Sequence, residues 1–578
     1  MNGAEILIDA LINEGVDTVF GYPGGVVIPI FDVLYRTEKI KFILTRHEQG
    51  ATHAADGYAR ATGKVGVCLV TSGPGATNTI TGIANAKMDS VPIVVISGQV
   101  ASANIGTDAF QETDMVGLTR SICKHNYLVK SVEELPSILK EAFFIARTGR
   151  PGPVAVDIPV NVSNGILEDY QYPQDVSLPG YKPVTNGNQK QIERLAQAIN
   201  EAKRPLLYTG GGIVIAEASR ELTDLLDKTS IPIVITLMGL GSIPSDYPTF
   251  LGMPGMHGTM AANLALTECD LLIGVGVRFD DRITGPRELF ATQATIAHID
   301  IDPAEIGKIV KPQIPVVGDA KQVLRELVKR VSPRRPNEWN RHTESWKCQF
   351  PMTYDQNAEP CILPQYVIDR VSALAPPDTI IVTDVGQHQM WAAHFYQHKK
   401  PRAFLTSGGL GTMGFGLPAA MGAAVGRPGQ TVISISGDGS IQMNIQEFAT
   451  CAINNIPVKT VILNNSYLGM VRQWQELFWD EHYSQTCLKR VSDCPPVCAG
   501  PGANCPPHYI PDFVKIAEAN RIPGYRATQP SEVDAVLKEG LGQPGPVIME
   551  FVVKSLENVY PMIPPGKPIS AIIPGRSV

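Results

Sequence analysis

Three stretches of the chain repeat one pattern of apolar and polar positions. Each starts with an apolar run, passes through a glycine-rich turn into a segment with apolar residues at helical spacing, and ends in a second apolar run that begins with Val-Pro or Ile-Pro. An apolar strand, a helix and another strand in this order predict a right-handed parallel βαβ unit. The three stretches are 65–98, 204–236 and 431–465.

The recurrence predicts more than one domain. At 578 residues the chain is longer than a single hydrophobic core supports. We therefore expect an α/β fold of three doubly wound parallel-sheet domains. The alternative is chance recurrence of a common motif within one large sheet. The expected domains are 1–168, 189–335 and 362–556, with a C-terminal lid or tail over 557–578 and connecting segments at 168–189 and 332–360.

Composition and charge narrow the class of protein. Apolar residues make up 44% and charged residues 18% of the chain, which is ordinary for a compact soluble protein. The net charge is −7 and no dense run of Lys and Arg occurs, so nucleic acid and anionic membranes are not expected partners. The apolar stretch 91–97 is too short to span a bilayer. The N-terminus has early acids and no basic region, so we expect no signal peptide and a cytoplasmic enzyme.

The third unit places an acid, Asp438, in a turn of the kind that binds phosphate. A helix of about fifteen residues rises about 22 Å. A strand of six residues returns about 20 Å, which brings Asn465 to the same sheet edge, about 5 Å from Asp438. Oxygen ligands with one negative charge suit Mg²⁺, which takes its other ligands from phosphate and water. The cation would let the turn's backbone N–H groups at Gly437, Gly439 and Ser440 hold a diphosphate.

"GDG" alone is also compatible with an ordinary turn. "GDG" followed by a helix, a strand and "NN" resembles the diphosphate-binding motif of thiamine diphosphate enzymes. The resemblance implies that Asp438, Asn465 and the backbone carbonyl of Tyr467 are magnesium ligands.

A second segment, "ILTRHEQGATHAADGYARATG" (43–63), resembles the part of these enzymes that activates the cofactor. Glu48 matches the glutamate that hydrogen-bonds the aminopyrimidine ring. Taken alone, Glu48 would be a solvated acid paired with Arg46. Its place after the apolar strand 40–44, at the start of a helix, favours the catalytic role. In the family this glutamate comes from the partner chain, which implies a homodimer as the minimum active unit.

A glycine- and alanine-rich stretch, 407–426, predicts a closely packed entry to a helix. The resemblance adds two roles here. The Gly411 carbonyl would accept from the aminopyrimidine, and Met413 would be the wedge beneath the bent cofactor. A flexible, polarizable thioether suits such a wedge.

Over almost the whole chain the resemblance narrows to the catalytic subunit family of acetohydroxyacid synthase, also called acetolactate synthase. This family decarboxylates pyruvate on thiamine diphosphate and transfers the hydroxyethyl group to a second pyruvate or to 2-ketobutyrate. The products lead to branched-chain amino acids. The segments that carry the resemblance are "GYPGG" (21–25), "RHEQ" (46–49), "GTDAFQE" (106–112), "RPGPV" (150–154), "GMHG" (255–258), "GVRFDDRITG" (276–285), "LNNSYLGMVRQWQELF" (463–478) and "VYPMIPPGK" (559–567).

The middle unit favours the biosynthetic branch of this family, which binds FAD without redox work. A strand that ends in an acid is a common way to hold a ribose or ribityl hydroxyl. The fermentative, flavin-free relatives lack the pattern "RFDDR", although this pattern alone would also fit a solvated charge cluster. The resemblance implies FAD-binding residues Arg150, Gly211, Gly212, Thr236, Leu237, Met256, His257, Gly276, Arg278, Asp280, Arg282, Asp300, Ile301 and Asp319.

Arg282 and Trp474 are expected to line the pocket of the second substrate. A guanidinium can bind a carboxylate through two hydrogen bonds. The indole would contact the alkyl group of 2-ketobutyrate. Phe110, Gln111 and Met470 should complete the channel. The family also implies a tetramer and a possible small regulatory subunit.

The chain departs from the family in two places. Val160 stands where many members carry a lysine near the channel mouth. A cysteine-rich insert, 487–509, has the spacing C-x6-C-x3-C-x6-C, which fits no zinc-finger signature. Free thiols, two disulfides and a Zn or iron–sulfur site all stay open for it. Its cysteines are Cys487, Cys494, Cys498 and Cys505, while six others, which we expect to be small buried hydrophobes, stand singly.

Three other functions are rivals of this one. Within the thiamine group, the rivals are a simple 2-ketoacid decarboxylase and a flavin-dependent pyruvate oxidase. From another class, the rival is a catalytically inactive regulatory paralogue. Such a paralogue commonly loses the activating acid or the metal ligands, whereas Glu48, Asp438 and Asn465 are all present.

Overall fold

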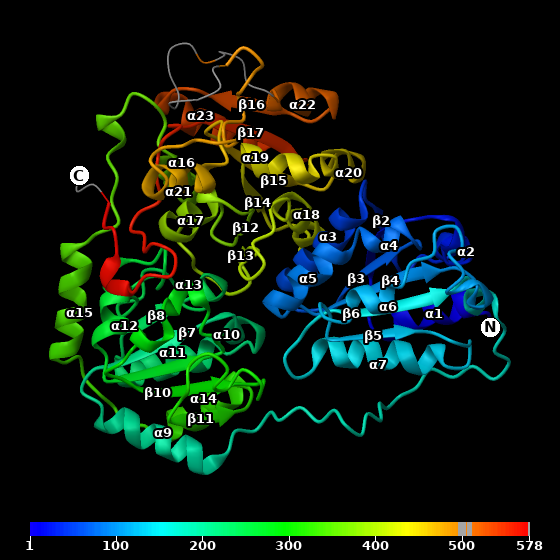
Figure 1. The fold of residues 1–578 in the computed structure, drawn as a ribbon, viewed down its shortest axis with the longest axis horizontal. Helices are drawn as coiled ribbons and strands as arrows, with labels where there is room; N and C mark the ends of the chain where they lie inside the picture. Colours follow the sequence, from blue (N-terminus) through cyan, green and yellow to red (C-terminus); the bar gives the residue numbers. More distant parts are fainter. Residues whose placement is uncertain (495–504, 506–510, 576–578) are drawn as a thin grey trace.

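The computed structural model describes residues 1–494, 505 and 511–575, which form three separate sheets (Figure 1). All strand pairs in the three ladders are parallel, and helices cover both faces of each sheet. The expectation of three doubly wound α/β domains is confirmed, and a single large sheet is excluded. The strand orders are β2-β1-β3-β4-β6-β5, β11-β10-β9-β7-β8 and β13-β12-β14-β15-β17-β16.

The first domain is built on a six-stranded sheet whose central strands are buried along their whole length. Burial on both faces explains why these strands read as continuous apolar runs. Its strands are β1 Thr18–Tyr22, β2 Lys41–Leu44, β3 Gly66–Val70, β4 Ile93–Gln99, β5 His125–Leu128 and β6 Val154–Pro159. Its helices are α1 Gly3–Asn13, η1 Gly25–Val27, α2 Ile28–Tyr35, α3 Glu48–Thr62, α4 Pro74–Thr77, α5 Ile80–Asp89, η2 Ser102–Asn104, α6 Met115–Thr119, α7 Leu135–Arg147 and α8 Val160–Asn164.

The middle domain has a five-stranded sheet, and several of its helices begin at a polar cap. Asp319, for example, accepts a hydrogen bond from the Gln322 N–H at the start of α14 (Ala320–Arg330). The strands are β7 Pro205–Thr209, β8 Ile233–Ile235, β9 Leu271–Val275, β10 Thr295–Asp300 and β11 Ile314–Val317. The helices are α9 Gln189–Glu201, α10 Gly211–Ile215, α11 Ser219–Thr229, η3 Leu237–Gly239, α12 Met260–Glu268, α13 Asp281–Thr284, η4 Arg287–Leu289, α14 Ala320–Arg330, α15 Glu338–Gln349 and η5 Gln356–Ala358.

The third domain repeats the six-stranded arrangement of the first. Its strands are β12 Ile380–Thr383, β13 Phe404–Leu405, β14 Val432–Gly437, β15 Val458–Asn464, β16 Gly524–Ala527 and β17 Val547–Val552. Its helices, with one short turn in the tail, are α16 Pro364–Leu374, α17 Gln387–Phe395, α18 Gly416–Gly426, α19 Asp438–Ile441, η6 Gln442–Asn444, α20 Glu447–Asn454, α21 Gly469–Phe478, α22 Phe513–Ala519, η7 Pro530–Glu532, α23 Val533–Gly542 and η8 Ile569–Ala571.

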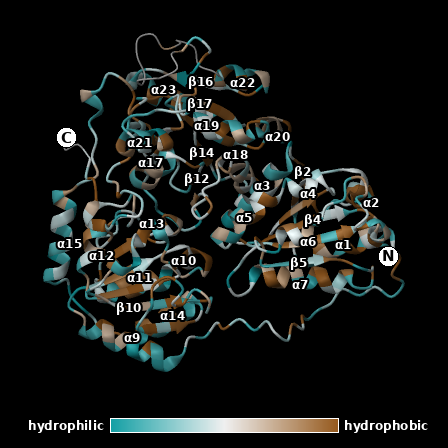
Figure 2. Ribbon diagram, in the orientation of Figure 1, coloured by the Kyte–Doolittle hydropathy of each residue, from teal (hydrophilic) through white to brown (hydrophobic). Residues whose placement is uncertain are grey.

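Hydrophobic residues concentrate in the sheets, while outer helices such as α9 and α15 are largely hydrophilic (Figure 2). The first and third domains share a core through α3 and α18, which lie against each other. Their backbones approach closely at two glycines. A Cβ on Gly57 would lie 2.1 Å from the Ala419 carbonyl oxygen, and one on Gly422 would lie 1.9 Å from the Ala54 carbonyl oxygen.

The connecting segments differ from each other. Residues 165–188, all of them described, contain no helix or strand and run as a long trace from the first domain to the middle one (Figure 1). The segment 332–360, by contrast, contains α15, which packs on the middle domain. The Trp339 indole N–H donates to the Pro205 carbonyl over 3.0 Å. The buried indoles in "NEWNRHTESW" explain why this segment folds as a helix.

Two local expectations need correction. The helix after the Gly-Asp-Gly turn is not continuous, because it is divided into α19, η6 and α20. Among the single cysteines, Cys348 is exposed and Cys361 is half-buried, while the other four are buried as expected. Within the described residues, no helix combines the length and apolarity that crossing a bilayer would require.

Candidate functional site

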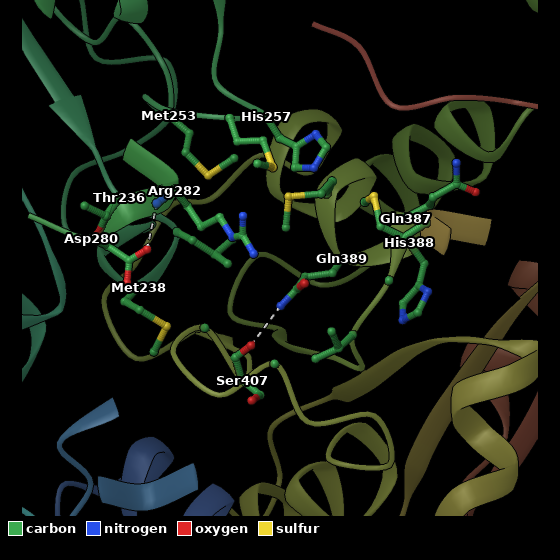
Figure 3. Close-up of a pocket in the computed structure, with 18 of the residues that line it drawn as sticks. Thr236, Met238, Met253, His257, Asp280, Arg282, Gln387, His388, Gln389 and Ser407 are labelled. Carbon is green, nitrogen blue, oxygen red and sulfur yellow. Dashed lines mark hydrogen bonds between the residues drawn. The ribbon is translucent and has the colours of Figure 1, made fainter. Parts of the chain in front are cut away.

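A cavity of about 540 Å³ (Figure 3) lies between the middle and third domains, at the carboxyl ends of strands from both sheets. Ligands of open α/β sheets bind at this kind of edge. Met88, Asp89 and Ser90 of the first domain also line the cavity. The cavity brings together most of the residues singled out in the sequence. They are Gly211, Gly212, Thr236, Leu237, Met256, His257, Gly276, Arg278, Asp280, Arg282, Gly411, Met413, Gly437, Asp438, Gly439, Ser440, Asn465, Tyr467, Met470 and Trp474.

Asp438 and Asn465 lie at one edge of the third sheet because β14 and β15 are parallel neighbours, with Gly437 opposite Leu463. Asp438 is 4% exposed. Burial raises the pKa of Asp438 to about 7, although nearby backbone N–H groups, including those of Asn465 and Ser466, favour the charged carboxylate. A buried carboxylate beside an amide oxygen is the donor set that Mg²⁺ prefers, so the residues fit a divalent cation.

Two further polar residues of this site, Gln387 and His388 at the start of α17, had no signal in the sequence. The His388 ring lies against the turn, since a Cβ on Gly437 would be 2.9 Å from its Nδ1. Its Nε2 is buried and has no hydrogen-bond partner. Gln387 accepts a hydrogen bond from Asn465 Nδ2 over 3.3 Å. An orphaned imidazole nitrogen beside the turn fits an anionic group bound there.

The loop before α18, which carries Gly411 and Met413, is held at both ends by buried carboxylates. Asp384 accepts from the backbone N–H groups of Gly414 and Gly416, both over 2.9 Å. From the first domain, Asp89 accepts from two N–H groups at the other end of the loop, and its carboxylate also pairs with Arg60 over 2.9 Å. Gly411 itself has a φ of 72°, in the left-handed region that favours glycine.

Arg282 and Trp474, far apart in the sequence, meet in the cavity. The Arg282 guanidinium carbon lies 6.0 Å from the centre of the Trp474 ring. The guanidinium is about half exposed, and the indole nitrogen of Trp474 is buried without a partner. A cation over an aromatic face, with donors directed to open space, can receive a carboxylate that has an apolar tail.

The C-terminal tail braces this part of the cavity. Figure 1 shows it running from the third domain down to the middle one. On α21, Gln473 exchanges two hydrogen bonds of 2.9 Å with the backbone of Val559. Further along, the Ile563 N–H donates to the Met256 carbonyl over 2.8 Å, and the Met256 N–H donates to the Arg282 carbonyl over 2.7 Å. The tail therefore connects the element that carries Trp474 to the loop that carries Arg282.

A second cavity of about 460 Å³ continues from the first, sharing Gly212, Gly276 and Arg278 with it. Its far end holds the remaining residues of the middle-domain set: Arg150, Asp300, Ile301 and Asp319. Asp300 ends β10 as expected, and burial raises its pKa to about 6. Together the two cavities form an elongated space with an acid at one end, which suits a dinucleotide.

Three residues expected at the site, Glu48, Phe110 and Gln111, line neither cavity. Glu48 starts α3 and accepts a hydrogen bond from Asn78 Nδ2 over 2.9 Å. Arg46 donates instead to backbone carbonyls, so the Arg46–Glu48 ion pair is not formed. Gln111 lies near Glu48 across one turn, because a Cβ on Gly73 would meet Gln111 and one on Gly75 would meet Glu48. Phe110, next to them, is 88% exposed.

The two departures from the family occupy different places. Val160 is the first residue of α8 in the first domain. In the insert, Cys487 pairs through its backbone with Tyr467, and both Cys487 and Cys494 carry free thiols. Cys498 lies outside the described residues. Among the described residues, no group of three His, Cys, Asp or Glu side chains could hold a metal ion.

Comparison with known proteins agrees with this geometry. Models of thiamine pyrophosphate enzymes match the chain three times: the N-terminal binding domain at 1–118, the central domain at 192–327 and the C-terminal binding domain at 384–551. The acetolactate synthase large subunit of Corynebacterium glutamicum is 46% identical over 99% of this chain and 90% of its own length. The isozyme 2 large subunit of Escherichia coli is 46% identical over 98% of both. The probable acetolactate synthase large subunit of Methanocaldococcus jannaschii is 48% identical over 99% and 95%.

Three parallel sheets, a Gly-Asp-Gly turn opposite Asn465 and the three matched domains define a thiamine diphosphate-dependent enzyme. Within that class, the chain belongs to the acetolactate synthase large-subunit family. Its activity is acetolactate synthesis on the way to branched-chain amino acids.

Proposed function

We propose that Asp438, Asn465 and the Tyr467 carbonyl bind Mg²⁺, and that the cation neutralises the diphosphate of the cofactor. The single observation that carries this proposal is the buried Asp438 carboxylate at the sheet edge beside Asn465. The backbone N–H groups of Gly437, Gly439 and Ser440 and the unpartnered His388 Nε2 would hold the phosphate oxygens. When bound, thiamine diphosphate supplies the chemistry that decarboxylates a 2-ketoacid and keeps its electron pair for transfer.

Glu48 is assigned to the other end of the cofactor, where its carboxyl group holds a proton against the aminopyrimidine ring. The Gly411 carbonyl would accept a hydrogen bond from the same ring, and the Met413 side chain would support the cofactor. Since Glu48 lines neither cavity of its own chain, we assign it to the cofactor of a partner chain. The minimum active unit is then a homodimer, and a tetramer is its proposed assembly.

The proposed substrate pocket is part of the first cavity, which Arg282 and Trp474 line. Arg282 binds the carboxylate of the second 2-ketoacid, pyruvate or 2-ketobutyrate, and Trp474 contacts its alkyl group. Met470 lines the same cavity. Gln111, with Phe110, completes the channel from the partner chain.

The proposed ligand of the middle domain is FAD, which would take no part in redox chemistry there. Binding of FAD would distinguish the chain from the fermentative, flavin-free relatives. Arg150 and the acids Asp300 and Asp319 lie at the end of the elongated space suited to the adenosine half. The remaining proposed contacts are Gly211, Gly212, Thr236, Leu237, Met256, His257, Gly276, Arg278, Asp280 and Ile301.

The same proposal includes the division of the chain into domains 1–168, 189–335 and 362–556 and a C-terminal tail, 557–578. Because the relatives are named large subunits, a small regulatory subunit is a proposed partner. The cytoplasm is the proposed location.

The proposal is tested with the purified chain, thiamine diphosphate, Mg²⁺ and FAD, incubated with pyruvate and then with added 2-ketobutyrate. We expect products that give acetoin-type colour after acid treatment, with no oxygen uptake and with protein-bound flavin that keeps its oxidised spectrum. Acetaldehyde as the main product would indicate a simple decarboxylase, and oxygen uptake with flavin turnover would indicate an oxidase. No product at all would indicate the inactive regulatory paralogue.

A further inference from the structure

A buried acid of the third domain, Glu447, reaches across to the first domain. It is the first residue of α20 and its side chain is 0% exposed. Its carboxylate accepts the Arg46 backbone N–H, with distances of 3.0 and 3.2 Å to its two oxygens, and the His47 backbone N–H also stabilises it. On its own helix, the Thr450 hydroxyl donates to it over 2.7 Å.

These contacts lie directly before Glu48, the residue that begins α3. The first N–H groups of a helix have no partner within the helix, and a negative charge near them is favourable. Glu447 supplies such a charge from another domain. The chain leaves room for it at Gly50, where a Cβ would lie 2.5 Å from Glu447 Oε1.

Burial of this carboxylate is costly unless it is fully hydrogen-bonded. Burial raises the pKa of Glu447, and the donors from Thr450, Arg46 and His47 oppose that rise. The apolar contact between α3 and α18 already holds the two domains together. A buried acid is therefore not needed for cohesion here. Apart from the Thr450 hydroxyl on its own helix, its hydrogen-bond donors belong to the backbone that leads into Glu48.

We propose that Glu447 is a positioning residue for Glu48: by fixing the backbone at Arg46 and His47, it sets where the Glu48 carboxylate is presented. The inference rests on the proposed function, which assigns Glu48 to the aminopyrimidine ring. Glu447 lies on the same strand–helix–strand unit as Asp438. In the proposed homodimer, this unit joins the metal site of one cofactor to the acid that serves the other.

The first test measures the backbone contact itself, without cofactor. Amide hydrogen–deuterium exchange, resolved to the peptide that contains Arg46, is compared between the wild-type chain and Glu447→Gln. We expect the Arg46 amide to exchange at least about tenfold faster in the variant, because its acceptor is weakened. Protection equal to the wild type would overturn the inference.

The second test measures the chemistry that Glu48 serves. The rate at which the C2 hydrogen of bound thiamine diphosphate exchanges with deuterium is followed by NMR after acid quenching. We expect Glu447→Gln to slow this exchange by about 10- to 100-fold, the cost of misplacing a reacting group by about 1 Å. Cofactor affinity should stay within about twofold, because Asp438 and the Gly-Asp-Gly turn are unchanged.

Thr450→Val is the matched control, since it removes a contact to Glu447 but leaves the acceptor of the Arg46 amide in place. Its C2 exchange should remain close to that of the wild type. If Glu447→Gln does not fold, Glu447→Asp keeps the charge but shortens the reach, and slower C2 exchange is again expected. A wild-type C2 rate in a folded Glu447 variant would overturn the inference alone. A wild-type rate in Glu48→Gln, measured in parallel, would overturn the proposed role of Glu48 as well.

Discussion

Asp438 is an acid placed where a phosphate is expected, and its surroundings explain why it is tolerated. Backbone N–H groups, including that of the neighbouring Asn465, stabilise a carboxylate that burial keeps from water. A divalent cation bound there converts the site from one that repels a diphosphate to one that attracts it.

Replacement of this acid tests the metal site. Asp438→Asn should raise the Kd of thiamine diphosphate at saturating Mg²⁺ by at least about tenfold, or about 1.4 kcal/mol, because Asp438 is the charged member of the three proposed ligands. Isothermal titration with the cofactor measures the change. Asp378→Asn, an exposed acid of the same domain, is the control and should bind as the wild type does. Equal cofactor affinity in both variants would contradict the assignment of Asp438.

Trp474 carries a prediction about acceptor choice. Trp474→Leu shortens the apolar wall next to Arg282, so the preference for 2-ketobutyrate over pyruvate should fall by about tenfold, the range that one methylene contact contributes. Competition between the two acceptors, with both products quantified, measures the ratio. Trp479→Leu, at an indole that is 68% exposed beyond the end of α21, should leave the ratio unchanged. An unchanged ratio in the Trp474 variant would remove it from the acceptor pocket.

Among the helices and strands, the features that were predicted correctly are those that the local pattern of apolar and polar residues determines. The apolar runs became buried parallel strands, and Glu48 and Asp300 stand at the predicted helix start and strand end. The break between α19 and α20 was not predicted, since periodicity does not register a short 3₁₀ turn within an apolar face. Gln387 and His388 were missed because they follow β12 with no spacing signal, and only the fold brings them to the turn.

The crossing of α3 and α18 depends on residues without side chains. Gly57→Ala should lower the midpoint of thermal unfolding by several degrees, because its Cβ would lie 2.1 Å from the Ala419 carbonyl oxygen and overpacking costs about 1–3 kcal/mol. Differential scanning fluorimetry measures the midpoint. Gly542→Ala is the control, since nothing lies within 4 Å of its added Cβ. Equal midpoints for the two variants would show that the contact between the two helices accommodates the added methyl group.

In the whole molecule, the residues assigned to the proposed site lie in two separate places. The cavity between the middle and third domains has Asp438 and Arg282, whereas Glu48 and Gln111 cluster around a turn of the first domain and line neither cavity. Each chain carries both groups of residues, but in different places. In a symmetric dimer, the cavity of one chain can therefore be completed by the first domain of the other, which gives two complete sites.

Complementation between two inactive variants tests this arrangement. Glu48→Gln and Asp438→Asn should each be nearly inactive alone. In a mixed dimer, the first chain still offers Asp438 and the second still offers Glu48, so one of the two sites is intact. Random pairing after equal co-expression should therefore restore about a quarter of the wild-type acetolactate synthesis. Purification through tags on both chains isolates the mixed dimer, which should reach about half. A control chain with both substitutions, co-expressed with either single variant, should restore nothing. If the mixed dimer is as inactive as its parents, Glu48 acts within its own chain and the shared-site dimer is wrong.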